Sequence, residues 1–139
     1  MKLGLNKCLR WLLVSGLTAA VITSRGSFGA EPGVGLNDGV FSSQQVKSGK
    51  RLYKKYCKSC HEGDYFGPVL LAWQGEQLAS FFDVMTSAMP ENDPGSLEQE
   101  QYTDLLAYIL KISGYPQDNR ALNPGTEEFA SIVIEAPLH

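Results

Sequence analysis

The sequence predicts a small, mainly α-helical protein. Three segments repeat apolar residues at steps of three and four positions, which is the spacing of one helix face, and an alternating strand pattern appears only at Ser131–Glu135. A length of 139 residues with 43% hydrophobic residues fits one domain with a small core. We expect this domain over residues 42–116, after a flexible lead-in over 30–41 and before an irregular C-terminal extension over 117–139 that packs on or near it.

The first 29 residues have the pattern of a secretory signal peptide. Basic Lys2, Lys7 and Arg10 precede the apolar run Trp11–Thr23, and small residues follow it. The run is shorter than the roughly 18 residues that a membrane-spanning helix needs. The spacing of the small residues favours cleavage after Gly29, although a cut after Ala30 also fits. We therefore expect export to the periplasm and no stable membrane anchor afterwards. Cleavage leaves eight basic against fifteen acidic side chains, a net charge of −7, and so acidic a chain predicts no nucleic-acid partner.

The first helix of the domain follows the lead-in, whose Gly, Pro and Asn residues show no period. It is expected to begin with Ser42 or Ser43 as N-cap and to run into Cys57. Its apolar and aromatic positions recur at helical steps: Val46, Gly49, Tyr53 and Tyr56. A second helix is predicted within 76–88 and ends before Pro90. Its apolar face is Leu78, Phe81, Phe82 and Met85.

The third helix has the clearest signals in the chain. Ser96 and Gln99 have the spacing of a capping box, and Lys111 suits the negative C-terminal end of the helix dipole. Gly114 and Pro116 stop the helix. The expected buried stripe is Tyr102, Leu105, Leu106, Ile109 and Ile112.

The segment Cys57-Lys-Ser-Cys60-His61 is the strongest chemical signal. A disulfide here would close a tiny loop, a zinc site would lack its fourth ligand, and a redox dithiol is expected in a βαβ setting that is absent. A haem uses every residue of the cluster, because both thiols can add to its vinyl groups and the imidazole can then ligate the iron. The segment therefore predicts one covalently bound haem c, held through Cys57 and Cys60, with His61 as an axial ligand.

The sixth iron ligand is expected to be a methionine. After the leader only Met85 and Met89 are available. Met85 completes the apolar face of the second helix, which is better explained by packing. Met89 precedes Pro90, which disfavours helical geometry at the residue before it, so an irregular segment can turn the sulfur toward the iron. We predict His61 and Met89 as the metal ligands.

The order of these features resembles a class I cytochrome c. A helix ends in the CxxCH segment, Gly67–Leu70 reads Gly-Pro-x-Leu, Met89 is followed by Pro90, and the final helix carries aromatic residues. The resemblance implies an all-α cytochrome c fold over 42–116, with helices packed around one haem. In that family the first helix crosses the last one. Gly49 and Tyr53 against Tyr102 and Leu106 fit that crossing.

Two further residues are predicted to touch the cofactor. The second ring nitrogen of His61 needs an acceptor, often a backbone carbonyl, and the resemblance implies that Pro68 supplies it. Trp73, with Tyr65, could shield the haem edge or donate a hydrogen bond to a propionate, although aromatic residues in small domains are often plain core.

The segment 89–116 resembles more closely the single-haem domains that accompany pyrroloquinoline quinone dehydrogenases of alcohols and sugars. This implies redox proteins as partners, with a periplasmic quinoprotein dehydrogenase as donor and an oxidase or another cytochrome as acceptor. Two features depart from that subgroup: only 28 positions separate His61 from Met89, and Glu62 replaces a frequent glycine. The shorter loop would leave more of the haem edge open.

His/Met ligation leaves no open position on the iron, which favours one-electron transfer over substrate chemistry. We therefore expect an electron carrier and not an enzyme. The alternative is a haem-based sensor or small-ligand binder in which Met89 is displaced. A peroxidase-like enzyme is disfavoured, because the mature sequence has no second internal histidine or arginine-rich pocket to serve as a distal acid.

Overall fold

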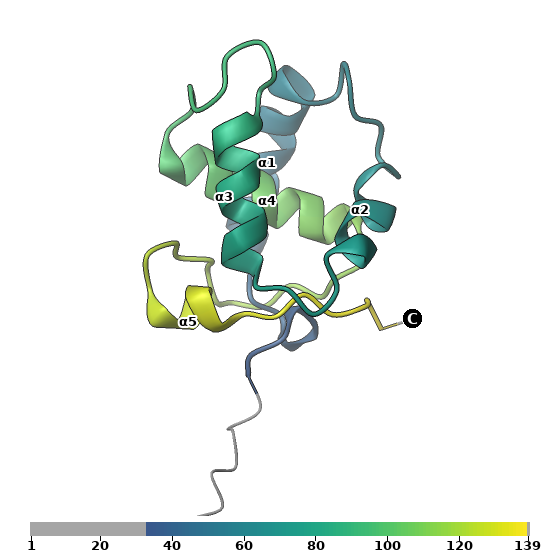
Figure 1. The fold of residues 1–139 in the computed structure, drawn as a ribbon, viewed down its shortest axis with the longest axis vertical. Coiled ribbons are helices and arrows are strands. Elements are labelled where there is room, and N and C mark those ends of the chain that lie inside the picture. Colours follow the sequence, from purple (N-terminus) through teal and green to yellow (C-terminus); the bar gives the residue numbers. More distant parts are fainter. Residues whose placement is uncertain (1–32, 139) are drawn as a thin grey trace, which may run out of the picture.

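The computed structural model describes residues 33–138. Over this part of the chain the elements are η1 (Leu36–Asp38), α1 (Ser43–Tyr56), α2 (Phe66–Ala72), α3 (Leu78–Ala88), α4 (Gln99–Ile112) and α5 (Glu127–Ser131) (Figure 1). This confirms the mainly helical fold class. The expected signal peptide, residues 1–29, lies outside the described residues. Among the residues described, none of the helices has the length and apolar character needed to cross a membrane.

The close crossing of α1 and α4 organises the domain. A Cβ atom built on Gly49 of α1 would lie 2.6 Å from the carbonyl carbon of Asp104 and 2.8 Å from the Cβ of Tyr108. Because only glycine leaves room for this approach, the two helix backbones can meet here. The expected crossing is confirmed, but Gly49 meets Asp104 and Tyr108 of α4 in place of Tyr102 and Leu106.

The start of α1 agrees with its sequence signals. The Ser42 hydroxyl accepts a hydrogen bond from the Gln45 N–H at 3.3 Å, and the Gln45 side chain accepts one from the Ser42 N–H at 3.2 Å. These two bonds satisfy backbone donors that the first helical turn leaves unpaired. α1 then runs to Tyr56, and Cys57 caps its C-terminus as predicted.

The predicted N-terminus of α4 is wrong by a few residues. Ser96 lies in a turn, with its N–H donating to the Asp93 carbonyl at 3.3 Å, and the N-cap is Glu98. The Glu98 N–H donates to Oε1 of Gln101 at 3.0 Å, so the same three-residue spacing recurs two positions later. The buried stripe is confirmed from Tyr102 to Ile109, whereas Ile112 is only half-buried.

The structure adds a short helix, α2, that the sequence did not predict. Its seven residues are too few to show a helical period, and it contains Gly67 and Pro68. Both fall in the first turn, where a proline costs little because the backbone N–H has no intrahelical partner. Phe66 and Leu70 are its buried residues.

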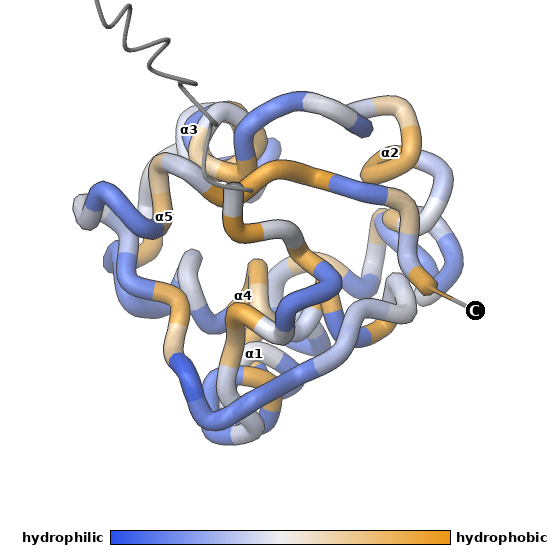
Figure 2. Tube along the Cα trace, turned by 90° about the horizontal axis from the view of Figure 1, so that it is seen from below, coloured by the Kyte–Doolittle hydropathy of each residue, from blue (hydrophilic) through white to orange (hydrophobic). Residues whose placement is uncertain are grey.

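The lead-in and the C-terminal extension pack against each other beneath the helices (Figure 1). Residues 132–134 run between the lead-in and the loop joining α2 to α3. The Val133 carbonyl accepts from the Leu36 N–H at 3.2 Å, and the Ile132 and Ile134 carbonyls accept from Leu78 and Gly75 at 2.8 Å. Figure 2 shows this hydrophobic stretch crossing the lower face between α5 and the C-terminus.

These contacts change the expectations for both ends of the domain. The lead-in was expected to be flexible, yet Leu36 and Phe41 are 0% exposed, because apolar residues without a period can still be buried by distant segments. The expected strand at 131–135 forms only isolated bridges, from Val133 to Gly35 and to Gln77. The extension also contains α5, whose N-cap Thr126 accepts a hydrogen bond from the Phe129 N–H at 3.2 Å.

We predict that replacing Gly49 by Ala destabilises the fold. The added methyl group would force α1 away from α4, and overpacking of this kind typically lowers the free energy of unfolding by about 1–3 kcal/mol. Denaturant titration of the purified holoprotein measures the change.

Gly67→Ala is the matched control. Gly67 is also helical, and a Cβ built on it meets no atom within 4 Å. The free energy of unfolding should change by less than about 1 kcal/mol. Equal losses in both variants would show that close approach at Gly49 is not the constraint.

Candidate functional site

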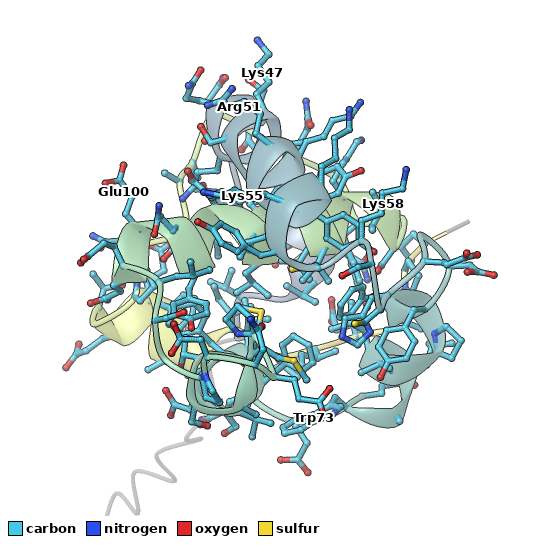
Figure 3. All side chains as sticks on the ribbon, turned by 90° about the horizontal axis from the view of Figure 1, so that it is seen from above. Lys47, Arg51, Lys55, Lys58, Trp73 and Glu100 are labelled. Carbon is cyan, nitrogen blue, oxygen red and sulfur yellow. The ribbon has the colours of Figure 1, made fainter. Side chains whose placement is uncertain are left out.

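A cavity of about 730 Å³ lies among the end of α1, α2, α3 and α4. Its lining includes most of the residues selected from the sequence, together with the second methionine: Cys57, Cys60, His61, Trp73, Met85 and Met89. Residues that are distant in the chain therefore meet at one site. Trp73 lies across the cavity from Lys55 (Figure 3).

The turn after α1 gathers both cysteines and the histidine. The Cys57 carbonyl accepts hydrogen bonds from the Cys60 N–H at 3.1 Å and from the His61 N–H at 2.9 Å. Cys57 is half-buried and Cys60 is exposed. Burial, followed by the nearby Cys60, raises the pKa of the Cys57 thiol. Both sulfurs thus sit on one closed turn, ready to be linked to a single cofactor.

Tyr53 of α1 holds this turn in place. Its hydroxyl donates to the His61 carbonyl at 2.6 Å and lies 3.2 Å from the Glu62 carbonyl. The side chain is buried, and burial, followed by the neighbouring Cys57, raises the pKa of its hydroxyl. The proton that makes these bonds is therefore kept over a wider pH range than in an exposed tyrosine.

The His61 ring is packed but not fully hydrogen-bonded. It lies against Tyr65 and Phe66, with ring centroids 4.3 and 5.3 Å away. Its Nδ1 atom is buried and has no hydrogen-bond partner within the described residues. A buried polar atom without a partner is costly. The His61 side chain also lines the cavity beside two thiols, which fits a site for a bound group.

Pro68 is not brought to the cavity with the other predicted residues. It lies in the first turn of α2, is exposed, and is not part of the cavity lining. Its proposed role as the source of an acceptor for His61 stays a prediction. Trp73 lines the cavity and packs edge-to-face on buried Phe81, with centroids 5.5 Å apart. It therefore belongs to the wall, with a half-buried ring.

Both methionines also line the cavity. Met85 lies on α3, and Met89 follows the end of the helix in an extended conformation, as Pro90 predicts. The Met89 carbonyl accepts a hydrogen bond from the Tyr102 hydroxyl at 2.6 Å and a longer one from the Gly95 N–H at 3.4 Å. Both thioethers are half-buried at the site, and the choice of Met89 as ligand stays a prediction.

The donor set of the cavity fits haem c. Two thiols three positions apart, an adjacent imidazole and a thioether in the same lining are the groups that bind this cofactor in c-type cytochromes. The remaining wall includes buried Phe81, Leu105 and Ile109, which suits an apolar macrocycle. In a bound state Cys57 and Cys60 would hold the haem covalently and His61 would ligate the iron.

Sequence reasoning selected Tyr53 and Tyr102 only as core residues. Each uses its hydroxyl to hold the backbone of a predicted axial ligand. The sequence does contain one signal for these roles: a tyrosine on a buried helix face needs a hydrogen-bond partner for its hydroxyl. The identity of that partner depends on loops that no periodicity describes.

The all-α fold and the lining of the cavity are consistent with a small cytochrome c fold. Residues 44–109 match the family model described as cytochrome C oxidase, cbb3-type, subunit III. This match, over just under half of the sequence, supports a class I c-type cytochrome with covalently bound haem c, a haem-based electron carrier rather than an enzyme. Comparison with curated proteins and with solved structures found no match. The link to quinoprotein dehydrogenases stays a prediction.

We predict that Tyr53→Phe lowers the free energy of unfolding of the holoprotein by about 1 kcal/mol at pH 7, the typical net worth of a hydrogen bond. Because the pKa of Tyr53 is raised in the folded protein, its hydroxyl stabilises the fold fully at pH values below the ordinary pKa of 10.0. This stabilisation is lost as the pH rises from 10.0 through the raised pKa of the folded state. The difference between wild type and variant should therefore narrow above pH 10. Denaturant titrations between pH 7 and 11 measure it.

Tyr56→Phe on the same helix is the control, since the Tyr56 hydroxyl makes none of the hydrogen bonds among residues 33–138. It should leave stability nearly unchanged at every pH. A constant difference for Tyr53→Phe across this range would contradict the proposed role of its proton.

Proposed function

We propose that this chain is an exported single-haem cytochrome c that transfers one electron at a time between redox proteins, with His61 and Met89 as axial ligands. The observation that supports the proposal is one cavity whose lining combines the CxxCH turn with Met85, Met89 and buried apolar residues. Haem bound there supplies a one-electron iron couple. With both axial positions filled by side chains, no site remains for a substrate.

The residues around the cavity have separate roles in binding the cofactor. Cys57 and Cys60 retain the cofactor, Tyr53 fixes the backbone of His61, and the buried residues of the wall offer apolar contacts to the macrocycle. Part of the lining is exposed, including Tyr65 at 47% and Val84 at 51%. The cavity therefore reaches the surface, where a redox partner can approach the edge of the cofactor.

A haem-based sensor is the second candidate function. Met89 lies just beyond the end of α3, on a turn with exposed residues, and its carbonyl rather than its side chain is anchored. A small ligand could displace such a thioether without unfolding a helix. The variants described below separate this candidate from the electron carrier.

Covalent haem attachment is the first test. Haem staining on a denaturing gel should appear when the full chain is exported, and most of it should be lost in Cys57→Ala or Cys60→Ala, because both thioethers retain the cofactor. Expression without residues 1–29 supplies the control for export. Equal staining of the unexported protein would contradict the predicted signal peptide.

The methionine assignment predicts different results for two variants. Met89→Ala should abolish the methionine-to-iron charge-transfer band of the oxidised protein, lower the reduction potential, and open the iron to carbon monoxide or cyanide. Met85→Ala should keep the band and mainly reduce stability, by no more than about 2–5 kcal/mol because Met85 is only half-buried. Absorption spectra and redox titration of both holoproteins measure these effects.

An exchange of behaviour between the two variants would identify Met85 as the ligand. Loss of the band in wild type on adding a physiological gas, without any loss of fold, would favour the sensor. A five-coordinate spectrum in wild type would contradict His/Met ligation altogether.

We also propose that the partners dock beside α1. Six exposed cations on or just after this helix form the α1 basic patch: Lys47, Lys50, Arg51, Lys54, Lys55 and Lys58. Figure 3 shows labelled members of the patch projecting from α1. Lys55 also lines the cavity, so the patch adjoins the cofactor site. Charge of one sign next to a redox centre steers brief encounters with an oppositely charged protein.

The proposed donor is a periplasmic quinoprotein dehydrogenase, on the resemblance of segment 89–116 to cytochromes that accompany such enzymes. The proposed acceptor is a terminal oxidase or another cytochrome. An oxidase agrees with the description of the matching family, which names an oxidase subunit.

Reversing Lys54, Lys55 and Lys58 to Glu should slow reduction by a purified quinoprotein dehydrogenase at low salt, and leave the reduction potential nearly unchanged. Reversal of Lys47, Lys50 and Arg51 changes the charge equally, but farther from the cavity along α1. Stopped-flow reduction across ionic strengths compares the two triple variants. A rate indifferent to salt and to both reversals would exclude the patch as a docking site, and no reduction at all would exclude this donor.

A further inference from the structure

We propose that Tyr102 is the positioning residue for the sixth iron ligand, and that its hydroxyl controls how readily Met89 gives way to another ligand. This inference rests on the proposed ligation by Met89. It adds a residue that fixes the strength of that ligation without touching the iron.

The backbone of Met89 is held on both of its polar groups. Its N–H donates to the Met85 carbonyl at 3.0 Å, which closes the last turn of α3. Its carbonyl accepts from the Tyr102 hydroxyl at 2.6 Å and from the Gly95 N–H at 3.4 Å. The Tyr102 bond is much the shorter of the two and comes from α4, so it ties the ligand segment to the helix that crosses α1.

Tyr102 is also part of a wall between two cavities. It is 4% exposed, and it lines both the haem cavity and a second cavity of about 750 Å³ between α3, the start of α4 and α5. Leu97 lines both cavities as well. Gly95, whose N–H also donates to the Met89 carbonyl, lines the second cavity as well. Both donors to this carbonyl therefore border the second cavity.

The turn after Met89 offers little other restraint. Its own hydrogen bonds are local, from the Asp93 N–H to the Pro90 carbonyl at 2.9 Å and from the Ser96 N–H to the Asp93 carbonyl at 3.3 Å. Glu91 and Asp93 are exposed. The Tyr102 hydroxyl is therefore the link between this turn and the packed part of α4, and its removal favours conformations in which the Met89 sulfur is away from the iron.

The test is Tyr102→Phe in the exported holoprotein. The ring stays in the wall and only the hydrogen bond is lost. Imidazole, added to the oxidised protein, competes with Met89, and loss of the methionine-to-iron charge-transfer band reports its binding. We expect the variant to bind imidazole about fivefold more tightly, which corresponds to the typical net worth of one hydrogen bond.

Tyr115→Phe is the matched control. Tyr115 is equally buried, and its hydroxyl also donates to a main-chain carbonyl, that of Glu135, but it does not line the cavity. The loss of stability should be similar, while imidazole affinity should stay at the wild-type value. An equal gain in affinity in both variants would show that general destabilisation, and not Tyr102, governs exchange.

A double variant isolates the route through Met89. In a Met89→Ala background the sixth ligand is gone, so adding Tyr102→Phe should leave imidazole affinity unchanged. Wild-type affinity in the single Tyr102→Phe variant, or a gain that persists without Met89, would overturn the inference. Retention of the band in Met89→Ala would overturn the ligation itself, and this result does not involve Tyr102.

Gly95→Ala provides a second approach if Tyr102→Phe gives no folded protein. Gly95 has a φ of 73°, where a Cβ is strained, so this change loosens the other bond to the same carbonyl. Imidazole affinity should rise here as well. An unchanged affinity in Gly95→Ala would count against control by the Met89 carbonyl.

Discussion

The backbone contact of α1 with α4 at Gly49 is the constraint on which the site depends. Each helix of the crossed pair carries one tyrosine that holds a predicted axial ligand by its carbonyl: Tyr53 of α1 holds His61, and Tyr102 of α4 holds Met89. The CxxCH turn and the Met89 segment are thereby both tied to this pair of helices. Their separation is set by a contact that has no room for a side chain.

The cavity also explains how so short a chain can maintain a core. Phe81, Leu105 and Ile109 are buried around a space that a protein interior would otherwise close, because interiors are packed nearly as densely as organic crystals. An apolar cofactor that fills this space supplies contacts to all of these side chains at once. Folding and cofactor retention are then linked, since whatever binds only the folded chain stabilises it.

Periodic helices and local motifs could be predicted from the sequence, whereas contacts between distant segments could not. α1, α3 and the middle of α4 repeat apolar residues over several turns, and the cysteines and His61 form a contiguous motif. α2 and α5 are too short to show a period. The burial of Leu36 depends on Val133, almost a hundred positions away, and the hydroxyl of Tyr102 finds Met89 only because a loop returns to α4.

The C-terminal extension has a consequence for the order in which the molecule can be assembled. Every residue that lines the haem cavity precedes residue 110, whereas residues 132–134, which tie the lead-in to the loop between α2 and α3, come later in the chain. Because a chain is synthesised from its N-terminus, every residue that lines the cavity is present before residues 132–134 are added. The hydrogen bonds from Gly75 and Leu78 to residues 132–134 can therefore form only after every residue of the cavity lining has been synthesised.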